Sequence, residues 1–193
     1  MKQFNLGPSE NTTVNKGNIL LAEPFLDDPY FKRTVILVCE HNEEGSFGFV
    51  LNNYIDVELD QIMDGLPDFD TKISIGGPVK NSNLYYIHTL GNEIRESVEI
   101  FDGIFMGGDF DQLKDKIAHG LVDQNQVRFF VGYSGWSPQQ LEDELRMKSW
   151  FVGQASPNVL MNTGDSDLWK TILSTMGSRG KIIANLPDDP SLN

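Results

Sequence analysis

The sequence predicts an α+β protein with a mixed β-sheet in a single domain. A chain of 193 residues suits one domain, because domains typically contain roughly 100–200 residues. Hydrophobic residues make up 39% and charged residues 22% of the chain, which is ordinary globular composition. Pairs of apolar, β-branched segments alternate with isolated helical patterns. This order favours α+β over a regular strand–helix–strand fold.

The first expected strands flank a polar turn. Residues 19–22 form a short apolar run that ends before Pro24, since proline cannot donate to a β-ladder. Residues 34–40 are β-branched and apolar on both faces, which is typical of a central strand. Polar turn residues occupy positions 41–46, and a second strand is expected over residues 47–52. The two strands are therefore predicted to form a hairpin.

A short helix and three strands are expected in the middle of the chain. The helix covers residues 57–63, with its apolar side chains facing inward, and Gly65 and Pro67 end it. The strands cover residues 73–75, 84–90 and 97–105, with a turn at Asp102 and Gly103 inside the last one.

A longer helix is predicted to begin near Asp109. Phe110, Leu113, Ile117 and Leu121 recur at helical spacing and should face the core. A strongly apolar strand over residues 127–133 follows it.

The next helix has a clear start signal. Ser137 at the N-cap, Pro138 at the first helical position and Gln140 three residues after the serine form a capping box. Leu141 and Leu145 would mark the buried face of this helix.

The last elements are a strand over residues 150–152 and a helix. Asp165 or Ser166 would cap this helix, and Gly177 would end it. We expect a flexible N-terminal arm over residues 1–16, one domain over residues 17–185 and a polar tail over residues 186–193.

Charge and composition exclude several classes of function. The chain has 15 Lys and Arg against 28 Asp and Glu, a formal charge of −13, and its basic residues are scattered. We therefore expect no direct binding to nucleic acid or to an anionic membrane surface. There is no apolar leader or membrane-length apolar run, and Cys39 is the single cysteine. The expected location is the cytoplasm.

The end of the strand over residues 34–40 carries a possible nucleophile and base. Cys39 and His41 are two positions apart, so a regular strand would place them on one face. They could form a catalytic Cys–His pair, or Cys39 could be an inert core residue beside a hydrogen-bonded histidine. The histidines His41, His88 and His119 are far apart in sequence, and we expect no metal site and no cofactor.

Glycines and a buried arginine offer further candidates. Gly76, Gly77 and Pro78 follow a strand and could bind an anion through backbone N–H groups or form a tight turn. Arg128 lies in an apolar strand and needs a partner if it is buried, either a carboxylate such as that of Glu142 or an anionic ligand. The start of the helix near Ser137 could bind an anion or be a well-capped helix packed by Trp136.

Short motifs follow one another in a distinctive order between residues 17 and 177. They are Gly17-x-Ile19-Leu20-Leu21-Ala22-x-Pro24, Phe31-x-Arg33-Thr34-Val35, Glu40-His41-Asn42-x-x-Gly45, Gly48-Phe49-Val50-Leu51-Asn52, Gly76-Gly77-Pro78-Val79, His88, and Arg128-x-Phe130-x-Gly132-Tyr133-x-Gly135-Trp136-x-x-x-Gln140-Leu141-Glu142-x-Glu144, with Trp150 and Trp169 beyond them. In this order they resemble the YqgE/AlgH family of bacterial proteins.

The resemblance implies a curved, partly barrel-like mixed β-sheet flanked by helices in a cytosolic bacterial protein. The family carries the label of transcriptional regulators, and no catalytic residues are agreed for it. This chain departs from the family pattern at Cys39, Ser46 and Gln139.

The preferred hypothesis is a non-catalytic regulatory protein that binds a small ligand or a protein partner. Histidines in the site would make binding sensitive to pH near neutrality. The alternative is an enzyme in which His41 or His88 is the general base, Glu142 the acid or orienting group, and Arg128 the anion holder. If the protein acts on transcription, we expect it to act through another protein. The candidate binding residues are Glu40, His41, Asn42, Asn52, Gly76, Gly77, Pro78, His88, Arg128, Tyr133, Gly135, Trp136, Gln140 and Glu142.

Overall fold

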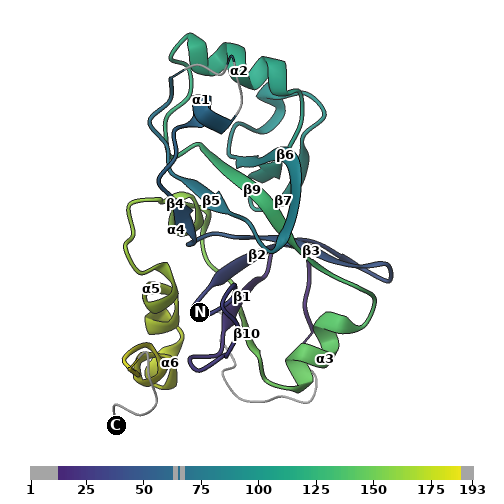
Figure 1. Ribbon diagram of the computed structural model, residues 1–193, viewed down its shortest axis with the longest axis vertical. Coiled ribbons are helices and arrows are strands. Elements are labelled where there is room, and N and C mark those ends of the chain that lie inside the picture. The colour runs from purple at the N-terminus through teal and green to yellow at the C-terminus, as the bar shows by residue number, and fades with distance from the viewer. Residues whose placement is uncertain (1–12, 63–64, 66–67, 188–193) are drawn as a thin grey trace.

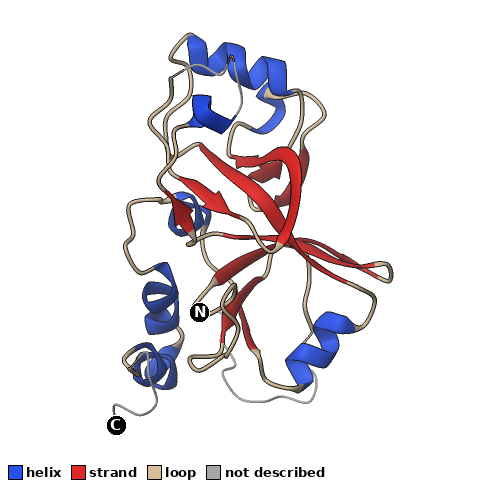
Figure 2. Ribbon diagram, viewed as in Figure 1, coloured by secondary structure: helices blue, strands red, loops and turns tan. Residues whose placement is uncertain are grey.

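A strongly curled β-sheet forms the centre of the molecule. The computed structural model describes residues 13–62, 65 and 68–187. Helices flank the sheet on several sides (Figure 2). The α+β class, the single domain and the partly barrel-like sheet are confirmed.

The described strands join into one sheet with the order β10-β1-β2-β3-β9-β6-β8-β7, and β4 and β5 attach to it through β9. Every pairing among them is antiparallel except that of β5 with β9, so the sheet is mixed, as predicted. The strands are β1 (Ile19–Ala22), β2 (Val35–Asn42), β3 (Gly45–Val50), β4 (Tyr54–Ile55), β5 (Ile73–Ile75), β6 (Val79–His88), β7 (Val98–Phe101), β8 (Ile104–Met106), β9 (Val127–Trp136) and β10 (Trp150–Gly153).

The helices cover different parts of the sheet (Figure 1). The first two lie beyond β6 at one end of the molecule, the third lies below the β2–β3 hairpin, and the last two lie beside β1. They are α1 (Leu59–Ile62), α2 (Phe110–Ala118), α3 (Gln140–Arg146), α4 (Pro157–Met161), α5 (Leu168–Thr175) and α6 (Gly177–Ala184), and a 3₁₀ turn covers Gly91–Glu93.

Three apolar clusters hold these layers together. The largest fills the inside of the curl, where Phe49 stacks on Phe130 at 4.5 Å and Trp169 of α5 is fully buried. A second cluster packs Phe129 against the side covered by α1 and α2. A third lies between α3 and the outer face of β1, β2 and β3, where Leu141 is fully buried. Both faces of the sheet are thus covered over much of its area.

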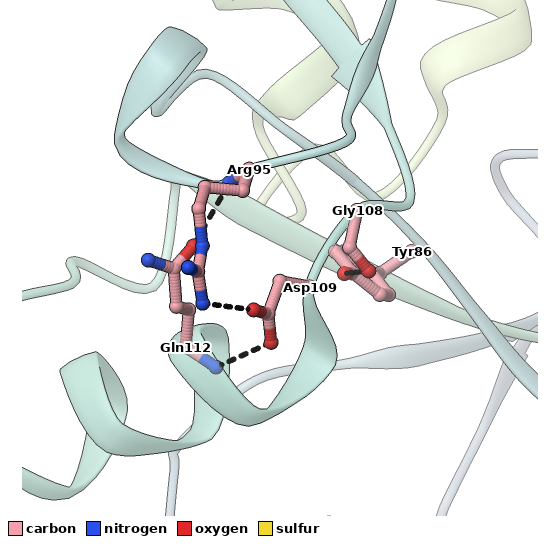
Figure 3. Close-up of polar contacts among 5 residues, drawn as sticks. All are labelled: Tyr86, Arg95, Gly108, Asp109 and Gln112. Carbon is pink, nitrogen blue, oxygen red and sulfur yellow. Dashed lines mark hydrogen bonds and ion pairs between the residues drawn. The ribbon is translucent and has the colours of Figure 1, made fainter.

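The helix predicted to begin near Asp109 does begin there. The Asp109 carboxylate accepts a hydrogen bond from the Gln112 backbone N–H at 3.1 Å and one from the Arg95 side chain at 2.7 Å (Figure 3). These bonds, led by the one from Gln112, hold the pKa of Asp109 below its usual value. Tyr86 donates to the Gly108 carbonyl at 2.9 Å beside this cap, and burial raises its pKa to about 12. Asp109 therefore fixes where α2 starts.

Helix α2 ends earlier than the spacing predicted. It stops at Ala118, and Gly120 follows in the left-handed conformation with φ of +67°. Leu113 and Ile117 are buried as predicted, but Leu121 is 64% exposed because it lies beyond this turn. The short helix predicted over residues 57–63 covers only Leu59–Ile62, and Met63 and Pro67 lie outside the described residues.

The prediction that Ser137 caps the following helix is wrong. Strand β9 continues to Trp136, and α3 starts only after Gln139, whose φ of +66° turns the chain. One half of the capping box still forms, because the Ser137 backbone N–H donates to the Gln140 side chain at 3.0 Å. The cross-strand pairing of Trp136 with Ser46 therefore takes precedence over the local cap signal.

The C-terminal region contains more helix than predicted. Asp167, not Asp165 or Ser166, caps α5 by accepting from the Lys170 backbone N–H at 3.0 Å. Gly177 ends α5 as expected, but α6 begins at the same residue, and α4 was not predicted. The sequences of α4 and α6 are short and have weak apolar periodicity, so these two helices form because they pack on the sheet.

The predicted arm and tail lie largely outside the described residues, and the domain boundaries stay predictions. Val14 is buried in the cluster under α3, and the Arg33 side chain donates to the carbonyls of Leu186 and Pro187 at 2.6 and 2.9 Å. None of the helices in the described ranges has the length and apolar character that crossing a bilayer requires.

Candidate functional site

The β2–β3 hairpin and α3 bring several candidate residues together. Ser46 pairs with Trp136 and Phe47 pairs with Gly135, so the end of the hairpin lies against the end of β9. The hairpin projects to the right in Figure 1, with α3 below it. We call this region the hairpin–α3 surface, which comprises Glu40, His41, Asn42, Glu43, Glu44, Ser46, Gln140 and Glu142.

His41 lies at the centre of the hairpin–α3 surface. Its Nδ1 atom is 2.8 Å from the Ser46 hydroxyl oxygen, and its Nε2 atom is 3.7 Å from a carboxylate oxygen of Glu142. The side chains of His41 and Glu142 are 20% and 38% exposed. His41 thus connects the hairpin to the first turn of α3 and still reaches solvent.

Exposed polar groups surround His41. Asn42 donates to the Glu40 carboxylate at 3.0 Å and accepts from the Glu44 backbone N–H at 2.8 Å. Glu40, Glu43 and Glu44 are all exposed. The hairpin–α3 surface is therefore strongly acidic.

Glu144 holds α3 against the sheet. It was not among the candidate binding residues predicted from the sequence. One of its carboxylate oxygens accepts from the indole N–H of Trp136 at 2.9 Å and from that of Trp150 at 2.7 Å, while the other accepts from Gln140 at 3.0 Å. Trp136 and Gln140 are thus structural partners of Glu144. The four-residue spacing from Gln140 to Glu144 on one helix could have indicated this pairing.

Gly76 and Gly77 pack against β9. The Gly76 N–H donates to the Val131 carbonyl at 2.9 Å, and the Gly76 carbonyl accepts from Val50 N–H and the Ser134 hydroxyl at 2.8 and 3.0 Å. The geometry favours close packing over anion binding for Gly76, because these peptide groups already have partners. Pro78 and Tyr133 flank the same contact, as Val79 pairs with Tyr133.

Asn52 also has a structural position. Its side chain accepts from the Val35 N–H at 2.8 Å and donates to the Arg33 carbonyl at 2.9 Å. Both side-chain groups of Asn52 are therefore used to hold the start of β2 beside the end of β3.

The prediction that Cys39 and His41 share a face is wrong. The register between β2 and β3 shifts between Val38 and Glu40, so Cys39 is the extra residue of a β-bulge. Cys39 is 1% exposed inside the curl, whereas His41 lies opposite Ser46 near α3. The bulge reverses the alternation of side chains, and the two residues do not form a catalytic pair.

We expect the Cys39 thiol to be unreactive in the folded protein. Burial raises its pKa far above the usual value, so almost no thiolate forms near neutral pH. Ellman's reagent should give no signal with native protein and one thiol per chain in denaturant. Rapid reaction of the native protein would show that Cys39 is accessible.

His88 is buried and both of its ring nitrogens have backbone partners. Nε2 lies 3.1 Å from the Gly107 carbonyl oxygen, and Nδ1 accepts from the Leu90 N–H at 3.2 Å. The ring also stacks on Phe105 at 5.8 Å. These contacts fit the neutral ring with its proton on Nε2, which makes His88 a structural residue remote from the hairpin–α3 surface.

Acid should destabilise the protein through His88. Burial lowers the pKa of His88 below 6.5, its ordinary value, so the folded state binds fewer protons than the unfolded state just below that pH. Stability should therefore fall as pH drops below 6.5 and level off below the lowered pKa. Thermal unfolding from about pH 8 to pH 5 should show this loss, and His88→Gln should reduce its slope. An identical slope in the variant would assign the effect to other groups.

Arg128 is fully buried and is held by backbone carbonyls. Its guanidinium donates to the carbonyls of Leu51 and Leu160 and lies 3.3 Å from the Tyr54 hydroxyl. Burial lowers its pKa, and among the described residues no carboxylate pairs with it. The expectation that Glu142 would neutralise Arg128 is wrong, because Glu142 contacts His41 instead.

The four residues of the enzyme hypothesis do not share one pocket. Arg128 pairs with Ile87 near the start of β9, whereas His41 lies at the other end of that strand, beside Trp136. Only His41 and Glu142 come together. Within the described ranges, no three His, Cys, Asp or Glu side chains are grouped as a metal site would require.

These observations describe an α+β half-barrel protein with a cluster of polar side chains where a projecting hairpin meets the adjacent helix. The chain belongs to the AlgH-like family, whose model matches residues 19–181. It is 39% identical to a UPF0301 protein of Chlorobium limicola over 96% of this chain and 99% of the relative. It is 37% identical to a UPF0301 protein of Cytophaga hutchinsonii over 93% of this chain and 100% of the relative.

Solved structures show the same fold. The AlgH protein of Pseudomonas aeruginosa has a TM-score of 0.71 at 27% identity, covering 89% of this chain and 94% of its own. A protein of Corynebacterium diphtheriae has a TM-score of 0.75 at 22% identity, covering 92% of this chain and 95% of its own. The resemblance inferred from the sequence motifs is confirmed.

Proposed function

We propose that this protein is a non-catalytic regulatory protein of the cytoplasm that binds a protein partner through the hairpin–α3 surface. The observation that carries the proposal is the position of His41 between the Ser46 hydroxyl and the Glu142 carboxylate on an exposed acidic surface. A partner with a basic surface would complement these acidic groups. This geometry supports a protein partner over the small ligand that the sequence also allowed.

Charge also supports action through a protein and not on DNA directly. The hairpin–α3 surface contains no Lys or Arg, and the chain carries a formal charge of −13. Contact with phosphates would therefore be repulsive. If the protein regulates transcription, its partner makes the contact with DNA.

Affinity capture from cells of the source species tests the proposal. Wild-type protein should recover a partner that His41→Ala and Glu142→Gln recover weakly or not at all. His119→Ala is the matched control, because His119 forms an exposed contact with Asp115 at 3.4 Å away from this surface. Equal recovery by all four proteins, or binding to duplex DNA at physiological salt, would refute the proposal.

A second candidate function is ester hydrolysis, favoured by one observation. Ser46, His41 and Glu142 lie in the order of a nucleophile, a base and an orienting carboxylate. Ser46 would attack an ester carbonyl while His41 takes its proton and passes it to the leaving alcohol, and water would then release the acyl group. Ser46 is only 9% exposed, which favours the binding function over this one.

Hydrolysis of p-nitrophenyl acetate separates the two functions. A catalytic serine predicts turnover that Ser46→Ala removes while the fold is retained. Equal rates for wild type and Ser46→Ala would exclude this chemistry.

A further inference from the structure

A solvent-open cavity lies in a part of the molecule that the hairpin–α3 surface does not include. Its volume is about 470 Å³, and it is bounded by the loop after β1, the turn between α3 and β10, β10 itself and α6. This volume is in the range of roughly 300–1,000 Å³ that is typical of small-molecule pockets.

Apolar side chains form part of the cavity lining. Phe25 is 36% exposed, Met147 is 70% exposed, and the half-buried Phe151 of β10 lies in the same wall. Burying these side chains under a ligand would be favourable, because it removes apolar surface from water.

The wall of the cavity is tied to the sheet. The Glu23 N–H donates to the Ser149 carbonyl at 2.9 Å, which joins the loop after β1 to the residue before β10. The Glu23 carboxylate accepts from the Phe25 N–H at 2.9 Å, which fixes the start of this loop. The lining side chains are therefore attached to a backbone held in place before any ligand binds.

Charged groups of both signs line the same cavity. Lys148 and Arg179 contribute two cations, and Glu23 and Asp27 contribute two carboxylates. In the part of the chain that the structure describes, Lys148, Arg179 and Asp27 form no ion pair through their side chains. A ligand with only one sign of charge would meet like charges here, whereas a zwitterion would find a partner for each of its ends.

We propose that this cavity binds a small zwitterion of dipeptide size with an apolar side chain. The ligand carboxylate would lie toward Lys148 and Arg179, its ammonium group toward Asp27 and Glu23, and its side chain against Phe25 and Phe151. The site is independent of the hairpin–α3 surface, so it can exist whether or not that surface binds a partner.

Titration of ¹⁵N-labelled protein with the dipeptide Leu-Phe tests the proposal. Signals from the loop after β1 and from β10 should shift in a saturable way up to about 10 mM ligand, since millimolar affinity is expected for so small a ligand. N-acetyl-Leu-Phe and Leu-Phe-amide, which each lack one charge, should bind about three- to tenfold more weakly.

Charge variants assign the contacts. Arg179→Gln and Asp27→Asn should each weaken Leu-Phe binding about three- to tenfold. Lys181→Gln is the matched control, because Lys181 is an exposed cation on α6 that does not line the cavity. Absence of saturable shifts, equal binding of the capped peptides, or equal loss in Lys181→Gln and Arg179→Gln would overturn the proposal.

Discussion

Replacing Gly77 by alanine is expected to destabilise the protein by roughly 3–5 kcal/mol. A Cβ atom at this position would lie 2.3 Å from both the carbonyl carbon and the carbonyl oxygen of Tyr133, and 2.4 Å from the Ser134 nitrogen. These are backbone atoms of β9, the strand that pairs with β3, β5 and β6, so they cannot move aside without disturbing the sheet. The Gly77 φ of +156° adds backbone strain for an alanine. Urea unfolding at 25 °C measures the loss.

Gly103→Ala is the matched control for this prediction. Gly103 also has a positive φ, of +81°, but a Cβ there would have no neighbour within 4 Å. Its substitution should cost only about 1 kcal/mol, from backbone conformation alone. If both variants lost the same stability, close contact with β9 would not be the cause.

Replacing Arg128 by methionine is expected to cost about 3 kcal/mol. Methionine fills much of the same apolar space but donates no hydrogen bond. The carbonyl of Leu160, at the end of α4, would lose the guanidinium donor, and the Leu51 carbonyl would lose it too while keeping the bond from the Ser74 hydroxyl at 3.2 Å. Loss of these bonds should outweigh the gain from no longer burying a charge.

Two comparisons test the role of Arg128. Arg146→Met removes an exposed arginine that pairs with Asp143, and it should change stability by less than about 1 kcal/mol. Limited proteolysis should cut the segment around α4 faster in Arg128→Met than in the wild type, because Arg128 attaches α4 to the sheet. An Arg128→Met protein as stable as the wild type would refute this anchoring role and reopen a ligand role for the arginine.

The elements that could be predicted are those with strong local signals. The apolar runs of β1, β2 and β9 and the capping aspartate of α2 lie where the sequence placed them. Elements whose formation depends on distant partners were missed or shifted. Strand β4 exists by pairing with β5, and α3 starts late because β9 stays paired with β3 up to Trp136.

The candidate site was predicted only in part, because its geometry also depends on contacts between distant segments. The pairing of the hairpin with the end of β9 and the bulge at Cys39 both depend on how distant strands align, so local patterns predicted neither of them. The sequence also named His88 and Arg128 as candidate site residues. The sequence did not show that both side chains would form hydrogen bonds with backbone carbonyl or N–H groups.

The fold class, the family and most strands could be predicted from the amino-acid sequence, because periodicity, turn residues and ordered motifs are local properties of the chain. Which polar residues meet became known only from the folded structure. It joined His41 to Ser46 and Glu142, buried Cys39 on the opposite face, and enclosed Arg128 among carbonyls. Such contacts depend on sheet register and on segments far apart in the chain. Arg128 and Leu51, for example, are 77 positions apart, and no local pattern encodes their contact.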